Sequence, residues 1–381
     1  MKNRPIHGGN LAWAAALAGC PPTSILDFSA SINPLGPPES AIAAIGRGLG
    51  AIAAYPDPHY SQLRSALAQH HDLDPAWVLP GNGSAELLTW AGRELAQLGI
   101  IETIAPTFRD YDRALETFGA TVCKNALQID NRALPLPSFA IAPHNEDAST
   151  HLPLFEGHRW PVGGAMYRWL HPPQRGLLLN NPHNPTGKIW SLETLLPLLT
   201  EFDLIVADEA FMDFLAPAEQ ASLVGWVKEF KNLVVLRSLT KFYSLPGLRL
   251  GYAIAHPDRL ARWQKWRDPW PVNVLAEAAA IAALQDTAFA QKTMEWLPPA
   301  KAELIKGLQA LEGLDPFEGA ANFLFVRCDR SVSQLQMRLL KKHRILIRDC
   351  LSFPELGDRY FRIAVRTPEE NQRLLEALRG L

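Results

Sequence analysis

The sequence predicts an α/β protein. We expect a large domain with a mainly parallel, seven-stranded-type sheet and a small α+β domain formed by both chain ends. Three observations lead to this prediction. Apolar runs of strand length alternate with helical patterns through the middle of the chain, as in βαβ units. Polar residues follow directly after several of these runs. The C-terminal part carries a long helical region, then separate strands and a final helix.

Length and charge narrow the class of protein. A chain of 381 residues has room for roughly two to three domains. We expect a large domain over residues 45–275, interrupted by a long insertion at 131–173, and a small domain from residues 1–44 and 276–381. The net charge of −2 supplies no basic field for nucleic acid.

Cysteine usage and hydropathy indicate a cytoplasmic protein. Four cysteines are far apart and form no CxxC pair, which is typical of reduced thiols: Cys20, Cys123, Cys328 and Cys350. The apolar run at residues 11–18 resembles a lipoprotein leader, but it is short, and the same pattern also indicates an ordinary helix that ends at Gly19. We therefore expect neither export nor a membrane span.

The N-terminal part combines turns with helices. The Asn-Pro and Gly-Pro-Pro sequences of residues 33–38 require extended or turn backbone. Helices are expected at residues 11–18, 39–49 and 61–70. A glycine-rich turn at residues 81–86 then opens another helix, whose first N–H groups suit a phosphate. A plain loop explains this turn equally well.

The middle of the chain supplies the sheet. Strands are expected at residues 100–105, 176–179, 203–207, 233–236 and 251–255. Helices are expected between them at residues 191–200 and 223–230. Residues 131–173 lack periodicity and are interpreted as a long excursion with one strand at 139–142. Because ligands of open α/β sheets bind at the carboxyl ends of the strands, the polar residues found there are candidate site residues.

The C-terminal part predicts the rest of the small domain. A long helical region is expected at residues 273–311, with a break at Pro298-Pro299. Strands should follow at residues 323–327, 345–348 and 361–365. A final helix is expected at residues 368–378, because Thr367 suits its N-cap and a proline and two acidic residues follow.

The stretch from Ser238 to Tyr252 is the most informative. Ser238 and Thr240 precede Lys241, and Arg249 follows it. Hydroxyls and an arginine can hold a phosphate, and a lysine beside them can form a Schiff base. This pattern suggests pyridoxal 5′-phosphate (PLP) with Lys241 as the Schiff-base lysine. Taken alone, a lysine at this position is more often a surface lysine after a core strand.

Three further residues follow strands and fit the same cofactor. Asp208 could pair with a protonated pyridine nitrogen, or it could cap the next segment. Asn184 could hydrogen-bond the ring oxygen, or it could be a turn residue. Phe108 could stack on the ring, or it could belong to the core.

The ordered combination is more specific than any of its members. An NPTG turn, a strand ending in DEAF and the SLTK stretch with its distal arginine follow one another. Over essentially the whole chain this resembles the fold-type-I, aspartate-aminotransferase-like PLP enzymes. The resemblance implies the roles given above for Lys241, Asp208, Asn184 and Phe108. It also implies a cradle for the cofactor phosphate: Ser84, Ala85, Ser238, Thr240 and Arg249.

The same resemblance implies an assembly and a substrate site. Tyr55 would reach the cofactor phosphate of a neighbouring subunit, so a homodimer is expected. Arg362 would grip a substrate carboxylate. A substrate phosphate would contact Arg348, with His7 and Asn33 closing over it. For Arg348 a surface ion pair, and for His7 a structural turn, are the alternatives.

Two subgroups of the family share features with this chain. Histidinol-phosphate aminotransferases and threonine-phosphate decarboxylases both resemble it in the YPDP turn and the FRIAVRTPEEN-like ending. The decarboxylases also resemble it in HGGN, in SASINPLGPP and in Phe211, where most aminotransferases carry a tyrosine that hydrogen-bonds the ring oxygen. Phe211 removes that donor, so the Schiff base should keep its proton to higher pH. The excursion at 131–173 is longer than this subgroup usually has.

These likenesses lead to a ranked expectation. The first is decarboxylation of L-threonine O-3-phosphate to (R)-1-aminopropan-2-ol O-phosphate in cobalamin biosynthesis. The alternative is a histidinol-phosphate-type aminotransferase. A third class, a PLP-binding regulator without turnover, carries an N-terminal DNA-binding domain. We expect none here, because the fold's own N-terminal segment begins within the first residues.

Overall fold

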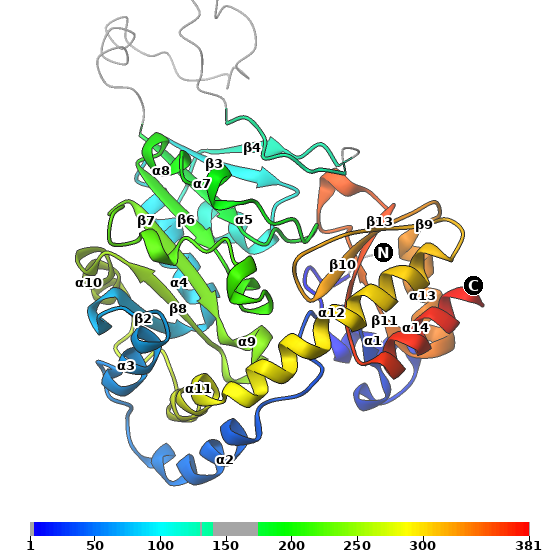
Figure 1. The fold of residues 1–381 in the computed structure, drawn as a ribbon, viewed down its shortest axis with the longest axis horizontal. Coiled ribbons are helices and arrows are strands. Elements are labelled where there is room, and N and C mark those ends of the chain that lie inside the picture. The colour runs from blue at the N-terminus through cyan, green and yellow to red at the C-terminus, as the bar shows by residue number, and fades with distance from the viewer. Residues whose placement is uncertain (1–3, 130–131, 140–173, 381) are drawn as a thin grey trace, which may run out of the picture.

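The protein is built around two sheets of unequal size. The computed structural model describes residues 4–129, 132–139 and 174–380. Figure 1 shows the large sheet and its helices on one side and a smaller body on the other, with helix α12 (Thr287–Gln309) running between them. The excursion predicted at 131–173, with its strand at 139–142, lies largely outside the described residues.

The large sheet has seven strands, as predicted. Its order is β2 (Val78–Asn82), β8 (Leu250–Ala255), β7 (Leu233–Ser238), β6 (Leu204–Asp208), β5 (Arg175–Asn180), β3 (Ile100–Ala105) and β4 (Val122–Ala126). Strand β8 is antiparallel to β7 and to β2, whereas all other neighbours are parallel. The sheet is therefore mainly parallel, and β8, next to the edge strand β2, runs in the opposite direction.

The central strands are mostly apolar because both faces of the sheet are covered. Ile205 and Ala207 of β6 pack into one hydrophobic cluster, while Leu204 and Val206 pack into another on the opposite face. Three helices contribute to the second cluster: α4 (Gly83–Leu95), α5 (Arg109–Glu116) and α10 (Pro257–Trp266). The first cluster includes residues of α3 (Ser61–His70), α11 (Val274–Gln285) and α12.

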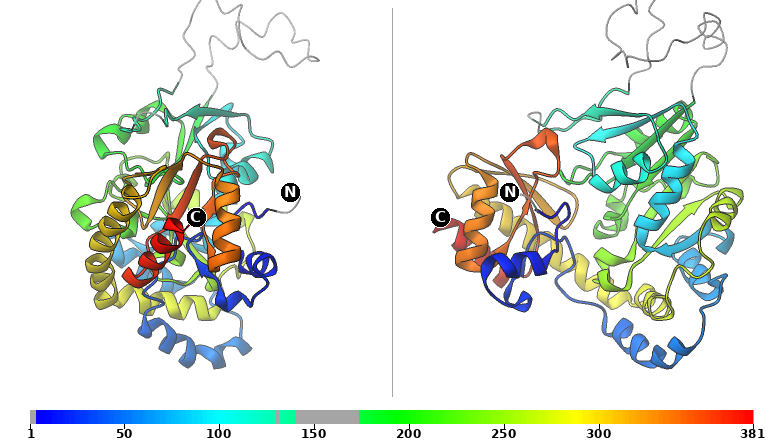
Figure 2. Two further views of the ribbon diagram at one scale, coloured as in Figure 1. Left: turned by 90° about the vertical axis from the view of Figure 1, so that its right-hand side faces the viewer. Right: turned by 180° about the vertical axis from the view of Figure 1, so that it is seen from behind.

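The small body contains elements from both chain ends (Figure 2). Its sheet has the order β12 (Arg348–Asp349), β13 (Tyr360–Ala364), β10 (Phe323–Cys328) and β9 (Leu314–Phe317). A separate parallel pair joins β1 (Leu26–Asp27) to β11 (Ile345–Leu346). Helices α1 (Leu11–Ala18), α13 (Val332–His343) and α14 (Pro368–Arg379) complete it. We propose that these two bodies are the two predicted domains.

Several predicted elements are wrong in detail. The helix expected at 223–230 is only a short 3₁₀ turn (Val224–Trp226), and it contains Gly225, which disfavours helix. The helix expected at 191–200 is two short ones, α7 (Leu192–Leu195) and α8 (Leu198–Glu201), because Pro197 interrupts it. The strand expected at 345–348 is divided between β11 and β12.

The long C-terminal helical region breaks at a different place from the one predicted. Helix α12 continues through Pro298-Pro299, and the break falls at Asp286 between α11 and α12. The Asp286 carboxylate accepts a hydrogen bond from the Phe289 amide at 2.9 Å and so caps α12. The predicted cap of α14 is confirmed, since Thr367 and Glu370 form a capping box.

Two further helices belong to the body that contains the large sheet. Helix α2 (Glu39–Gly48) packs on α11, and α9 (Leu239–Phe242) follows β7 directly. Among the described residues, no helix has both the length and the apolar character needed to cross a membrane. All four cysteines are free thiols.

The packing of α4 on α5 yields a test with a matched control. A Cβ at Gly92 of α4 would lie 2.3 Å from the Ala114 carbonyl oxygen, whereas Gly46 of α2 has open space around its Cβ position. We expect Gly92→Ala to lower the free energy of unfolding by about 1–3 kcal/mol. We expect Gly46→Ala to raise it by about 0.5–1 kcal/mol. Denaturant unfolding of both variants measures the difference, and equal effects would contradict this packing.

Candidate functional site

A cavity of about 320 Å³ lies where the central strands end. Asn180 and Asp208 are register partners at the ends of β5 and β6, and Ser238 ends β7. Parallel strands bring these ends to one edge of the sheet. Most of the predicted site residues line this cavity: His7, Ser84, Ala85, Phe108, Asn184, Asp208, Ser238, Thr240, Lys241, Arg249, Arg348 and Arg362.

The Asp208 carboxylate is held by two hydrogen bonds. The Tyr111 hydroxyl donates to Oδ2 and the Ala210 amide donates to Oδ1, both at 3.0 Å. Burial raises the pKa of Asp208 above its ordinary value, while these hydrogen bonds and the charge of Lys241 oppose the rise. The two donors therefore favour the ionised carboxylate in a site that otherwise disfavours charge.

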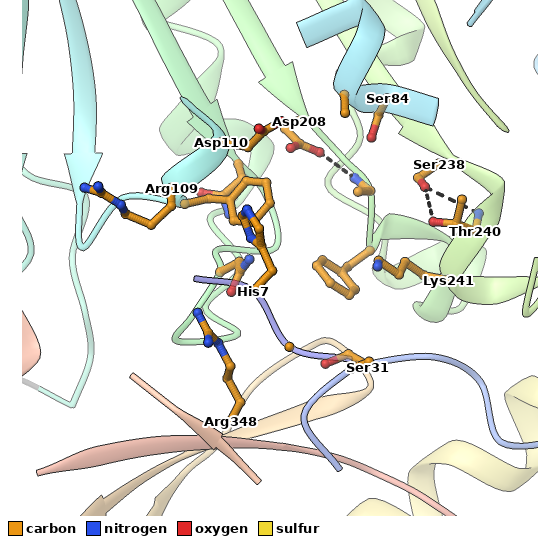
Figure 3. Close-up of a pocket in the computed structure, with 18 of the residues that line it drawn as sticks. His7, Ser31, Ser84, Arg109, Asp110, Asp208, Ser238, Thr240, Lys241 and Arg348 are labelled. Carbon is orange, nitrogen blue, oxygen red and sulfur yellow. Dashed lines mark hydrogen bonds between the residues drawn. The ribbon is translucent and has the colours of Figure 1, made fainter. Parts of the chain in front are cut away.

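The Lys241 amine lies in the same cavity, in the first turn after β7 (Figure 3). Burial lowers the pKa of Lys241 to about 8, and the charges of Arg362 and Arg249 add to this effect while Asp208 opposes it. A lysine with this pKa carries a substantial neutral fraction near physiological pH. The neutral amine is the form that attacks a carbonyl group.

One end of the cavity is suited to a phosphate. The first turn of α4 contributes Ser84 and Ala85, and Figure 3 shows Ser84 facing Ser238 and Thr240. The hydroxyl oxygens of Ser238 and Thr240 are 2.7 Å apart. Helix amides, hydroxyls and a guanidinium are the groups that bind phosphate.

Two glycines allow this cradle to close. A Cβ at Gly83, whose φ is +73°, would lie 2.6 Å from Nη2 of Arg249. A Cβ at Gly251 would lie 2.4 Å from the Ser84 amide nitrogen. The position of Gly251 leaves space only for glycine, and the positive φ of Gly83 favours glycine there. The first turn of α4 can therefore lie close to Arg249 and to the hydroxyls of Ser238 and Thr240, and these groups fit the phosphate of PLP.

The turn that carries Asn184 is fixed from both sides. Asn181 accepts from the Trp190 amide at 2.9 Å and donates to its carbonyl at 3.1 Å. His183 is fully buried with Nδ1 2.8 Å from the Thr186 hydroxyl, and burial lowers the pKa of His183 to about 3. This scaffold sets Asn184 at the cavity wall.

The other end of the cavity is cationic. Arg348 and Arg362 are register partners on β12 and β13. Arg362 donates to Asn184 Oδ1 and lies over the Phe323 ring, with 4.8 Å between the guanidinium carbon and the ring centroid. Burial, followed by the charge of Arg348, lowers the pKa of Arg362 to about 10.

His7 completes this end of the cavity. Figure 3 shows Arg348 extending from the small sheet toward His7. The His7 ring lies 5.8 Å from the Phe108 ring, measured between centroids. Burial lowers the pKa of His7, and the charge of Arg348 lowers it further. Two guanidinium groups and an imidazole thus face a space suited to anions.

The structure does not bring two predicted residues into the cavity. Asn33 is buried elsewhere, donating to the Phe242 carbonyl at 2.9 Å and to the Thr293 hydroxyl at 2.8 Å. It ties the N-terminal loop to α9, so its geometry does not support direct contact with a substrate. Tyr55 is 79% exposed and stacks on Trp270. Its predicted contact with a neighbouring subunit stays a prediction.

Sequence reasoning missed other lining residues and the partner of Asp208. Ser29, Ser31, Arg109, Asp110 and Ser352 line the cavity as well. The Ser31 hydroxyl is buried and lacks a hydrogen-bond partner among the described residues. Among these missed residues, a local sequence pattern could have identified Tyr111. It stands three residues after Phe108 and so shares a helical face with it.

Comparisons with known proteins agree with this geometry. A family model described as aminotransferase class I and II matches residues 23–378. The chain is 37% identical to the threonine-phosphate decarboxylase of Salmonella typhimurium, over 98% of this chain and 96% of that protein. It is 30% identical to histidinol-phosphate aminotransferase 2 of Ralstonia nicotianae, over 98% and 93% of the two chains.

A solved structure shares the fold. The histidinol-phosphate aminotransferase of Sinorhizobium meliloti, in complex with PLP, superimposes with a TM-score of 0.78 and covers 100% of this chain and 98% of its own. At 22% identity this likeness concerns the fold. The predicted family, fold class and PLP cofactor are thereby confirmed.

The lowered pKa of Lys241 predicts the pH dependence of cofactor attachment. Because the neutral amine reacts, the rate at which apoprotein binds PLP covalently should rise with pH and level off above about 8. An unperturbed lysine would level off only above about 10.4. Arg362→Gln removes a positive charge that lowers the pKa of Lys241, so in this variant the midpoint of the rate against pH should move to higher pH. Stopped-flow absorbance measures these rates, and Lys241→Ala should show no covalent band. A wild-type midpoint near that of an ordinary lysine would contradict the buried amine.

Proposed function

The chain belongs to the aminotransferase class I and II family, and from this premise we propose that it decarboxylates L-threonine O-3-phosphate. The product would be (R)-1-aminopropan-2-ol O-phosphate, a precursor in cobalamin biosynthesis. The observation that carries the proposal is the pair of cavity-lining cations on adjacent strands, Arg348 and Arg362. One molecule of threonine phosphate offers a carboxylate and a phosphate, one anion for each of them. The 37% identity to a threonine-phosphate decarboxylase supports the same reading.

PLP supplies the electron sink that makes a bond at the substrate Cα labile. The chain supplies the rest. In this proposal Asp208, whose carboxylate accepts hydrogen bonds from the Tyr111 hydroxyl and the Ala210 amide, pairs with the ring nitrogen. The cradle formed by Ser84, Ala85, Ser238, Thr240 and Arg249 holds the cofactor phosphate. Asn184 and Phe108 contact the ring.

Arg362 orients the substrate for the bond that breaks. Its guanidinium can hold a carboxylate through two parallel N–H bonds. Asn184 and the Phe323 ring hold that guanidinium in place. The orientation of the guanidinium then sets the orientation of the bound carboxylate. Lys241 can then return a proton to the carbon that loses carbon dioxide, because its pKa of about 8 lets Nζ hold a proton and release it.

In this proposal Arg348 and His7 bind the substrate phosphate. The buried Arg348 side chain extends toward His7, and the centroid of the His7 ring lies 5.8 Å from that of the Phe108 ring. A phosphate there would accept charge-assisted hydrogen bonds. The same phosphate would raise the pKa of His7 and so add a second positive charge.

A histidinol-phosphate-type aminotransferase is the second candidate. The 30% identity to such an enzyme favours it, and a histidinol-phosphate substrate also carries a phosphate for Arg348. A PLP-binding regulator without turnover is a weaker candidate, since Lys241 and the cradle are both present. We further propose a cytoplasmic homodimer in which the exposed Tyr55 side chain reaches the partner's cofactor.

Product analysis separates these candidates. Purified PLP-loaded protein should release carbon dioxide from L-threonine O-3-phosphate. In a parallel assay, histidinol phosphate with 2-oxoglutarate should yield no glutamate. Arg362→Gln should lower kcat/KM by about 100-fold, as expected for loss of a charge-assisted pair of hydrogen bonds to a reacting carboxylate. Glutamate without carbon dioxide would overturn the decarboxylase proposal. Neither product from a PLP-loaded protein would favour the regulator.

The residue at position 211 predicts a spectroscopic difference. Phe211 lines the cavity and packs against Phe323 with 5.0 Å between ring centroids. Phenylalanine offers the cofactor no hydroxyl, whereas tyrosine would stabilise a negative ring oxygen. Phe211→Tyr should therefore lower the pH at which the absorbance of the lysine-bound cofactor changes. Absorbance titration of both proteins measures this, and identical curves would count against the proposed contact.

A further inference from the structure

The N-terminal arm, residues 4–10, is fastened to the small body at several points. The Arg4 guanidinium forms an ion pair with Asp349, donates to Gln336 Oε1 at 2.8 Å and donates to the Ser333 carbonyl at 3.2 Å. At the other end of the arm, the Gly9 amide donates to the Ser29 hydroxyl at 2.8 Å. His7 lies between these two anchors.

Side chains from both faces of strand β12 contact the arm. Successive side chains of a strand point to opposite sides. Asp349 binds the Arg4 side chain on one side, while Arg348 donates to the carbonyl oxygens of Pro5 and Ile6 on the other. The arm thus passes over β12 beside the guanidinium that faces the cavity.

The close packing of the arm leaves His7 little freedom. A Cβ at Gly8 would lie 2.2 Å from the Ser29 carbonyl oxygen, so the backbone there rests directly on the loop that follows β1. The position of His7 in the cavity therefore depends on where the arm is anchored. Arg4 is the charged anchor on its N-terminal side.

The charges around Asp349 give Arg4 a second effect. Asp349 is buried, and its Oδ1 lies 3.9 Å from Nη1 of Arg348. Among the described residues, this is the one carboxylate within 4.0 Å of the Arg348 guanidinium. Arg4 neutralises Asp349 and so leaves the charge of Arg348 available to an anion in the cavity. Asp358 also lies near Arg4, but it is bound by Ser331 and Ser333.

We propose that the Arg4–Asp349 ion pair is a latch that positions the phosphate-binding end of the cavity. Arg4 is a positioning residue that acts through His7 and Arg348. It holds the arm so that His7 faces the cavity, and it prevents Asp349 from competing for Arg348. The proposal rests on the proposed function in one respect, that this end of the cavity binds a phosphate group.

The test uses inorganic phosphate as the probe, because its binding does not depend on which reaction the enzyme catalyses. Calorimetric titration of the PLP-loaded protein, whose cofactor occupies the other phosphate site, gives the Kd. Loss of a buried charge-assisted pair should raise this Kd about tenfold in Arg4→Gln. Arg4→Lys, which retains the charge, should recover most of the affinity.

A double variant distinguishes a latch from a generally structural contact. In Arg4→Gln the unpaired Asp349 competes for Arg348, whereas in Arg4→Gln/Asp349→Asn that competition is absent. The double variant should therefore bind phosphate more tightly than Arg4→Gln alone, with a Kd about threefold above that of wild type. A structural contact would make the double variant as weak as the single one, or weaker.

Two further measurements complete the experiment. In turnover, Arg4→Gln should raise KM for the phosphorylated substrate while kcat changes by less than about twofold. Hydrogen exchange of residues 5–10 should become faster, with no change in residues 239–252. Arg330→Gln is the matched control, because Arg330 pairs with Asp329 at the surface and should leave Kd and exchange unchanged. Thermal melting of each variant confirms that it is folded.

The outcomes separate this proposal from the proposed reaction. An unchanged Kd in Arg4→Gln, or a double variant no tighter than the single one, would overturn the latch. Phosphate binding that follows the expected order, without release of carbon dioxide from threonine phosphate, would support the latch and overturn only the decarboxylation. A wild-type protein that binds no phosphate would overturn the latch, whatever the product assay gives.

Discussion

The burial of a carboxylate and an amine in one cavity is the constraint on which the rest of the site depends. Desolvation disfavours both charges, raising the pKa of Asp208 and lowering that of Lys241. The charge of each group favours the charged form of the other and so partly opposes both pKa shifts. The Tyr111 hydroxyl and the Ala210 amide add stabilisation for the carboxylate. A cofactor that presents a cationic ring nitrogen and a carbonyl group matches this pair of side chains.

The framework behind the cavity fixes the ends of β6 and β7. Glu209 follows Asp208, and Arg237 precedes Ser238. Their side chains are 1% and 2% exposed and form a salt bridge at 3.1 Å. Asp213 also pairs with Arg237 at 2.6 Å. Replacing one member would leave an uncompensated buried charge, at a cost of about 3–5 kcal/mol. This pair therefore holds together the two strand ends that carry the candidate site residues.

The sequence predicted the grouping of candidate site residues where that grouping follows local order. Asp208 and Ser238 end apolar strands, and Asn184 and Lys241 follow such strands closely, so the parallel sheet was enough to bring the four residues to one cavity. Prediction failed where distant segments meet. Asn33 bonds across 209 residues to Phe242 and turns away from the cavity, and no local pattern reveals this. Strand β2 contains Pro80 and Gly81, and β1 has two residues, so neither has a strand signal.

The cationic end of the cavity shows how an anionic substrate can be selected. Arg362 bonds to the amide oxygen of Asn184, and Arg348 bonds to the carbonyl oxygens of Pro5 and Ile6. These acceptors are neutral, and charge-assisted bonds to a carboxylate or phosphate are roughly twice as strong as neutral ones. A guanidinium has five N–H donors, so each arginine can keep its neutral acceptors and gain a charge-assisted bond to an anion through a donor that remains. A substrate lacking either anion would forfeit that gain at one arginine, so the cavity favours molecules that carry both groups at the right separation.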